Sequence, residues 1–437
     1  MIKNKLLKNI SWLFFDKIVR IFGGLFIGIW IARYLGPEDF GVLNYALAYT
    51  ALFMLFVNLG LDQIVVREIV KTPKLLKYLL GTTFWLKFIG ALLSILFISI
   101  SLYFMKLDTI TTLVILVTSI GFIFQSFDVI DYYFQSQVLS KYVAAARSSA
   151  FILSSTLKIF LIINEFSVLY FAVALVIDAL FATIFLIYIY QKRGMNILKW
   201  KFSKNIAVKL LKYSWPLALS GFIISVYTKI DQIMIGNMLN LSEVGIYGVA
   251  TTLSTAWLFL PSIVVSTFMP YFVNLKKTNN ELYEYRLIQL YSLMFWIGVS
   301  VGVIVLVFGQ WIIHALYGPA YEEAYYALVF NIWNGIFISQ ALARSIWLIS
   351  ENLQKYRLYN NIFAVTLNIG VNFVLIPIYG ISGAAIATLL TQGLSTWVFP
   401  FLWKPMRSSN IAIMKAINPK YFININIKEN NESVSTN

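Results

Sequence analysis

The sequence predicts an all-α membrane protein in which twelve helices cross the bilayer as two related six-helix lobes. Three observations lead to this prediction. Of the 437 residues, 59% are hydrophobic and 12% are charged, whereas a soluble domain has about 25% charged residues. Apolar runs of about 20 residues, long enough for a helix to cross a hydrocarbon core, recur along the chain. A weak internal repeat divides the chain into two halves.

Twelve apolar runs account for most of the chain, and each is expected to form one membrane-spanning helix. They lack the alternation over about ten residues that is typical of membrane β-barrels. Because only helices and closed barrels satisfy the backbone hydrogen bonds in lipid, the runs are expected to be helices. The spans are expected at residues 11–34, 40–61, 76–104, 110–136, 143–163, 166–190, 212–239, 244–272, 286–314, 322–349, 356–377 and 382–403.

The internal repeat sets the expected domain organisation. At an offset of 204 residues, four positions carry the same residue type, namely Ile31 and Ile235, Leu35 and Leu239, Gly41 and Gly245, and Ala46 and Ala250. Both halves begin on the same side of the membrane, as in transporters whose two lobes alternate access. We expect an N-terminal lobe at 1–195, a basic amphipathic linker helix on the membrane surface at 196–211, a C-terminal lobe at 212–405 and a cytoplasmic tail at 406–437.

The net charge of +15 is informative because of where the charges lie. Most Lys and Arg residues fall in loops on the side of the N-terminus, whereas the opposite side carries only Arg33 and Lys106. By the positive-inside rule, both termini are expected in the cytoplasm. The excess positive charge then contacts anionic lipid headgroups, and no nucleic-acid partner is expected.

Among the charged residues of the predicted spans, eleven are candidates for a role in transport or charge balance, and each such charge costs about 2.5–3.5 kcal/mol near the centre of a helix. Such charges need partners or water, and a hydrated cavity between the lobes would provide both. The cations are Lys17, Arg20, Lys87, Lys158, Lys229 and Arg344, and the acids are Asp16, Asp128, Asp131, Asp178 and Asp231.

Arg20 is the leading candidate for binding an anionic substrate. Lys17 lies three residues before it, so the two side chains share one face of the first helix. The alternative is a local arrangement. Asp16 would then pair with Arg20 at a spacing of four residues, and Lys17 would extend to the cytoplasmic surface.

The second half offers its own candidate cations. Lys229 and Arg344 are expected to be the counterparts of Arg20. Lys229 and Asp231 are two residues apart and point to different sides of a helix, so they do not form a local pair. Lys87 and Lys158 are weaker candidates for substrate binding, because each side chain can extend to the membrane surface or stabilise a contact between helices.

The acids have two candidate roles, which are coupling transport to protons and neutralising nearby cations. Asp128 and Asp131 share a face of the fourth span. Neutralisation is favoured for this pair, because so many cations lie in the membrane with it. Asp16 and Asp231 have the same two candidate roles, and Asp178 is expected to be a structural partner.

No catalytic motif is found in the sequence. The chain has no Cys and one His, and it contains neither a P-loop nor a metal-ligand cluster. We therefore expect a transporter without a cofactor or metal, rather than an enzyme. The expected external loops are too short to hold the chemistry of a glycan polymerase or ligase, and a scaffold would leave the intramembrane charges unexplained.

Several short motifs resemble one family of bacterial transporters. In chain order they are Leu35-Gly36-Pro37-Glu38-Asp39-Phe40-Gly41, Asn58-Leu59-Gly60-Leu61, Arg67-Glu68, Phe134-Gln135 and Lys141-Tyr142. Over residues 5–405 the chain is similar to the Wzx-type flippases of polysaccharide repeat units. These belong to the polysaccharide branch of the multidrug/oligosaccharidyl-lipid/polysaccharide (MOP) flippase superfamily.

The resemblance implies a V-shaped transporter of twelve spans with a central cavity lined by basic residues. It implies that an undecaprenyl-pyrophosphate-linked oligosaccharide, such as an O-antigen or capsule unit, moves from the cytoplasmic to the outer leaflet of the bacterial inner membrane. Membrane lipids, and the polymerase and chain-length regulator of the same pathway, would be partners. The same superfamily offers an alternative, a cation-coupled multidrug antiporter of the MATE type, which would need acids to dominate its cavity.

Overall fold

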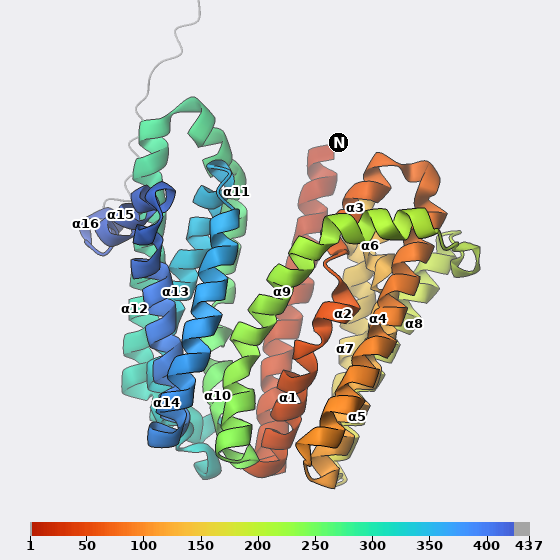
Figure 1. Cartoon of the computed structure of the whole chain (residues 1–437), viewed down its shortest axis with the longest axis horizontal. Helices are drawn as coiled ribbons and strands as arrows, with labels where there is room; N and C mark the ends of the chain where they lie inside the picture. The colour runs from red at the N-terminus through yellow and green to blue at the C-terminus, as the bar shows by residue number, and fades with distance from the viewer. Residues whose placement is uncertain (1, 424–437) are drawn as a thin grey trace, which may run out of the picture. The chain divides into compact units, whose positions relative to one another are not determined.

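The computed structural model describes residues 2–423, with the side chains of residues 20–423. Throughout this range the chain forms α-helices joined by short turns, and no strand occurs there (Figure 1). The prediction of an all-α membrane protein is therefore confirmed. Nine helices in the described range are long and apolar enough to cross a membrane, and the bent pair Arg20–Leu52 and Met54–Lys71 is a tenth candidate.

The helices of the first half follow the predicted spans closely. The first two spans are joined in α1 and continue into α2 and α3, and a 3-10 turn at Ser126–Asp128 divides the fourth span into α5 and α6. The helices are α1 (Ile2–Leu52), α2 (Met54–Asn58), α3 (Asp62–Lys71), α4 (Leu76–Met105), α5 (Thr109–Gln125), α6 (Val129–Ser136), α7 (Ser140–Ile163) and α8 (Val168–Lys192).

The second half repeats this pattern with longer helices. The eighth span is divided into α10 and α11, and the 3-10 turn η4 (Pro319–Tyr321) separates α12 from α13. The helices are α9 (Lys204–Met238), α10 (Leu241–Ala256), α11 (Phe259–Thr278), α12 (Asn280–Tyr317), α13 (Ala324–Ser350), α14 (Lys355–Gly393), α15 (Arg407–Lys415) and α16 (Lys420–Ile423).

Two glycines reverse the chain inside helices that are assigned as continuous. Gly36 in α1 has φ 72° and ψ 175°, and Gly380 in α14 has φ 60° and ψ −140°. Glycine is the residue that adopts such angles at little cost, because it has no Cβ. Figure 1 shows the ribbon of α1 turning back at the end opposite the N-terminus. With α1 and α14 each counted as two spans, the ten candidates become twelve, which is consistent with the prediction.

The connection between the halves differs from the prediction. Between α8 and α9 the chain forms only a 3-10 turn at Ile197–Lys199, and α9 then runs without interruption from Lys204. After this turn the backbone bonds to α4, since the Lys201 N–H donates to the carbonyl oxygen of Lys77 at 3.1 Å. Of the expected amphipathic helix at 196–211, only residues 204–211 are helical, at the start of α9. The position of this linker on the membrane surface stays a prediction. Its basic and apolar residues form a turn and the first turns of α9.

The described chain forms two compact units. Unit 1 comprises Met1–Thr252, Ile312–Ala324 and Ile369–Ala384, and unit 2 comprises Leu253–Trp311, Tyr325–Asn368 and Ala385–Asn437. These units differ from the predicted lobes, because α9, the first turns of α10 and two further segments of the second half pack with the N-terminal helices. The lobes, which were defined by the sequence repeat, stay a prediction.

Each unit has its own apolar core. In unit 1 the side chains of α3, α4, α6 and α8 bury residues such as Val65, Leu80 and Phe134. In unit 2 helices α11, α12, α13 and α15 bury residues such as Tyr291 and Ile346. In lipid the hydrophobic effect contributes little to helix association, because the lipid tails are as apolar as the side chains. Close side-chain packing of this kind therefore holds the helices together.

Candidate anion-binding site

A cavity of about 380 Å³ in unit 1 brings charged side chains from four membrane helices together. Arg20 enters it from α1 and Arg147 from α7. Asp128, at the end of η2, and Asp178, on α8, line the same space. Gln125 adds an amide group. The cavity therefore combines two guanidinium groups with two carboxyl groups inside helices that are long enough to span the bilayer.

Arg147 is the centre of an ion-pair cluster at this cavity. Its Nη2 atom lies 3.2 Å from Asp128 Oδ1 and 2.9 Å from Asp131 Oδ2. The side chain of Gln135 donates to the other oxygen of Asp131 at 2.9 Å. The two aspartates thus lie against a base, as the neutralising role requires. Whether they also couple transport to protons stays a prediction.

Lys87 extends this cluster into the core of unit 1. Its side chain is fully buried, and its ammonium group donates to the Tyr132 hydroxyl at 3.0 Å. The same ammonium nitrogen lies 3.9 Å from Asp128 Oδ2, and Tyr132 in turn donates to the carboxylate of Asp62. A buried charge requires such partners. Through these hydrogen bonds, Lys87 links α4 to α6 and, through Tyr132, to α3.

Sequence reasoning missed Arg147, although the residue lies inside the predicted span at 143–163. The two aspartates Asp128 and Asp131 could have indicated Arg147 from the sequence. Asp128 and Asp131 require a base, and Arg147, 19 and 16 residues away, is the nearest base within a predicted span. A charge count that includes every base of the spans, followed by a search for partners of the acids, would have found it.

The remaining predicted residues of the first half lie in different settings. Lys158 is buried on α7, and it is not among the residues that line the cavity. Asp16 and Lys17 belong to the first 19 residues, whose side chains lie outside the described part of the structure. The predicted shared face of Lys17 and Arg20 therefore stays a prediction.

The predicted residues of the second half do not line this cavity. Lys229 is half-buried on α9. Asp231 is buried and accepts hydrogen bonds from the Tyr247 hydroxyl at 2.9 Å and the Asn372 amide at 2.7 Å. The structure therefore places Asp231 in a polar cluster of α9, α10 and α14, within unit 1.

Arg344 lies in the core of unit 2 with 3% of its surface exposed. Its Nη2 atom donates to the carbonyl oxygen of Thr396 at 2.7 Å and to Asn410 Oδ1 at 2.8 Å. These bonds connect α13 to the end of the last span and to α15. In this conformation the side chain braces unit 2, and binding a substrate would require it to leave both partners.

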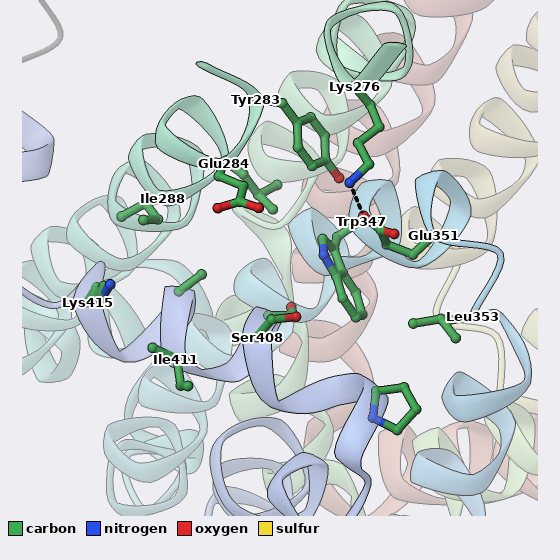
Figure 2. Close-up of a pocket in the computed structure, with 14 residues that line it drawn as sticks. Lys276, Tyr283, Glu284, Ile288, Trp347, Glu351, Leu353, Ser408, Ile411 and Lys415 are labelled. Atoms are coloured by element: carbon green, nitrogen blue, oxygen red, sulfur yellow. Dashed lines mark ion pairs between the residues drawn. The ribbon is translucent and has the colours of Figure 1, made fainter. Parts of the chain in front are cut away.

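A second cavity of about 530 Å³ lies in unit 2, and Figure 2 shows its residues. Lys276 Nζ forms an ion pair with Glu351 Oε1 at 2.6 Å, which Figure 2 marks with a dashed line. Glu284 and Lys415 also line the space. Its charges are balanced, and none of the predicted site residues lines it. Among the described residues, no group of three His, Cys, Asp or Glu side chains could hold a metal ion.

Comparison with known proteins adds a family and a fold. The model of a family described as "Polysaccharide biosynthesis protein" matches residues 6–276. The chain is 26% identical to the capsular polysaccharide biosynthesis protein CapF of Staphylococcus aureus, over 91% of this chain and 99% of CapF. It is 28% identical to the probable flippase AglR of Haloferax volcanii, over 50% of this chain and 48% of AglR.

Two solved structures share the fold. The lipid II flippase MurJ, in an inward closed conformation, superposes with a TM-score of 0.68 at 15% identity, covering 95% of this chain and 92% of MurJ. An inward-facing MATE multidrug transporter of the MOP superfamily superposes with a TM-score of 0.65 at 16% identity, covering 93% of this chain and 99% of the transporter. At such low identity, both similarities concern the fold.

Proposed function

Because the chain belongs to the polysaccharide biosynthesis protein family, we propose that it carries lipid-linked oligosaccharides across the bacterial cytoplasmic membrane. The cargo is an undecaprenyl-pyrophosphate-linked repeat unit, and it moves from the cytoplasmic to the outer leaflet by alternating access. The observation that carries the proposal is the cavity in which Arg20 and Arg147 lie among membrane helices. The family agrees with the polysaccharide branch that the sequence motifs resemble.

The two arginines suit the charged part of this cargo. A diphosphate loses hydration when it leaves the headgroup region, and guanidinium groups replace it with paired, charge-assisted hydrogen bonds. Asp128 and Asp131 hold Arg147 while the site is empty, so that this charge is never left unpaired. A membrane potential that is negative inside favours outward movement of an anion by about 2.3 kcal/mol per charge for each 100 mV.

The other predicted cations divide into two groups in this proposal. Lys17 and Lys229 are further contacts for the cargo along its path. Lys87 and Arg344, whose hydrogen bonds tie helices together, keep their units rigid while the carrier changes conformation. Lys158 is assigned to the same structural group because it is buried.

The orientation follows from the charges in the loops. Both termini lie in the cytoplasm, so the Gly36 turn and the end of α9 face the outside. The basic loops contact anionic headgroups on the inner side. The polymerase and chain-length regulator of the pathway would receive the cargo outside, and the chain itself transports without catalysing a reaction.

A multidrug antiporter is the second candidate function. The observation in its favour is that Asp128 and Asp178 line the same cavity as the two arginines, since carboxylates would attract cationic drugs. Ethidium efflux discriminates between the two functions. Cells that express this chain should export ethidium no faster than cells that carry an empty vector.

Deletion of the gene tests the proposed function in cells. We expect the lipid-linked oligosaccharide to accumulate on the cytoplasmic leaflet, because its synthesis continues while its export stops. Surface polysaccharide should fall, and the wild-type gene should restore it. Normal surface polysaccharide in the deletion strain, without accumulation of the lipid-linked precursor, would contradict the proposal.

A further inference from the structure

Gly41 and Gly245, which occupy equivalent positions of the sequence repeat, bring α1 and α10 into backbone contact. A Cβ atom added at Gly41 would lie 1.7 Å from the carbonyl oxygen of Leu241. One added at Gly245 would lie 2.1 Å from the carbonyl oxygen of Pro37. Pro37 and Leu241 are themselves separated by the repeat offset of 204 residues. The crossing is therefore symmetric. Gly41 packs against the carbonyl group four residues before Gly245, and Gly245 packs against the carbonyl group four residues before Gly41.

Neighbouring side chains extend this contact along both helices. The position of a Cβ at Gly248 is 3.1 Å from Asn44 Cγ, and a Cβ at Gly236 would lie 2.5 Å from the ring of Tyr45. The Tyr45 hydroxyl donates to Asn237 Oδ1 at 2.8 Å. Tyr45 is fully buried, so the interface excludes water at this level. All of these residues belong to unit 1.

A third segment covers the same end of unit 1. Tyr321, in η4, is buried, and its hydroxyl donates to the carbonyl oxygen of Ala32 at 2.7 Å. Its ring meets Phe40 edge to face, with 6.2 Å between the ring centres. The segment that carries Tyr321 belongs to unit 1 together with α1. Tyr321 thus packs against α1 on both sides of the turn at Gly36, through Ala32 and Phe40.

We propose that the crossing at Gly41 and Gly245 is the external closure of the carrier, and that release of cargo requires α1 and α10 to separate there. The assignment of this end to the outside rests on the proposed function and its membrane orientation. Small residues let helices approach closely in membranes. Here the opposing atoms are backbone carbonyl oxygens, which cannot rotate away as a side chain could. The contact is therefore either fully made or broken, as an alternating-access carrier requires.

A disulfide across the crossing tests the proposal, and the absence of native Cys makes the result simple to read. The double variant Asn44→Cys, Gly248→Cys places two thiols across the contact at a separation suited to a disulfide. Oxidation should join the two helices and lower transport about tenfold or more, and dithiothreitol should restore it. A protease site inserted between α8 and α9 reports the bond, because on a denaturing, non-reducing gel the cleaved halves migrate together only when it forms. Each single Cys variant is a control.

A second variant tests the glycines themselves. Gly41→Val in the double-Cys background should slow disulfide formation about tenfold, because the added side chain holds the crossing open. Gly28→Val is the matched control, since a Cβ at Gly28 has no atom within 4 Å. Unchanged cross-linking in Gly41→Val, or full transport by the cross-linked protein, would overturn the proposal. Cross-linking needs no cargo, so a carrier that cross-links as expected but moves no oligosaccharide would instead contradict the proposed function.

Discussion

Replacement of Arg20 by Ala should lower transport of the lipid-linked oligosaccharide about 10- to 100-fold, because a hydrogen bond to a charged group contributes about 1.5–3 kcal/mol. Arg20→Glu should abolish transport, since it places a negative charge beside the diphosphate. Arg20→Lys should be intermediate, because it keeps the charge and loses the paired geometry. Arg20 is exposed at its cavity, so the amount of protein in the membrane should not change. Surface glycan and an immunoblot of the membranes measure the two effects.

Arg357→Ala is the matched control for Arg20. Arg357 is also an exposed arginine on a long helix, α14, but it lines neither cavity. Its replacement should leave transport unchanged. If Arg20→Ala and Arg20→Glu both retained full activity, Arg20 would have no part in the mechanism.

Replacement of Arg147 by Met should destabilise the protein by about 3 kcal/mol, because it leaves Asp131 without its base and Asp128 with only the more distant Lys87. This figure is at the low end for a buried pair, since Arg147 keeps 29% exposure while Asp131 keeps 11%. Thermal unfolding in detergent should show the loss as a lower Tm. An unchanged Tm would mean that the carboxylates are neutralised in another way.

The double variant Arg147→Met, Asp131→Asn separates the two roles that we assign to Arg147. Removal of the charge on Asp131 should restore most of the lost stability, because fewer unpaired charges remain. Transport should stay low, since the guanidinium group for the diphosphate is still absent. If the double variant recovered both stability and transport, Arg147 would have only a structural role.

The sequence was sufficient to predict the helices, because their apolar runs are set by the thickness of the membrane. It also placed Gly36 and Pro37 in the short connection between the first two spans. The first part of the expected linker helix, before Lys204, is not α-helical for a physical reason. Basic and apolar residues alternate in the linker, but hydrogen bonds to α4 take up its backbone before α9 begins.

The candidate site was predicted in part. An arginine in a membrane helix is visible in the sequence, but its neighbours depend on how helices are arranged. Arg344 illustrates this limit. Its partners Thr396 and Asn410 lie 52 and 66 residues away, and a carbonyl oxygen or a neutral amide gives no charge pattern to search for. Arg20 and Arg344 therefore look alike in the sequence, although one lines a cavity and the other lies in a core.

Transport by the purified protein in lipid vesicles tests the central claim most directly. An undecaprenyl-pyrophosphate-linked oligosaccharide with a fluorescent sugar is placed in both leaflets, and an impermeant quencher reports how fast the inner pool becomes accessible. We predict that wild-type protein speeds this exchange over protein-free vesicles and that Arg20→Ala removes most of the increase. Exchange at the protein-free rate with folded wild-type protein, or equal exchange by Arg20→Ala, would contradict the account.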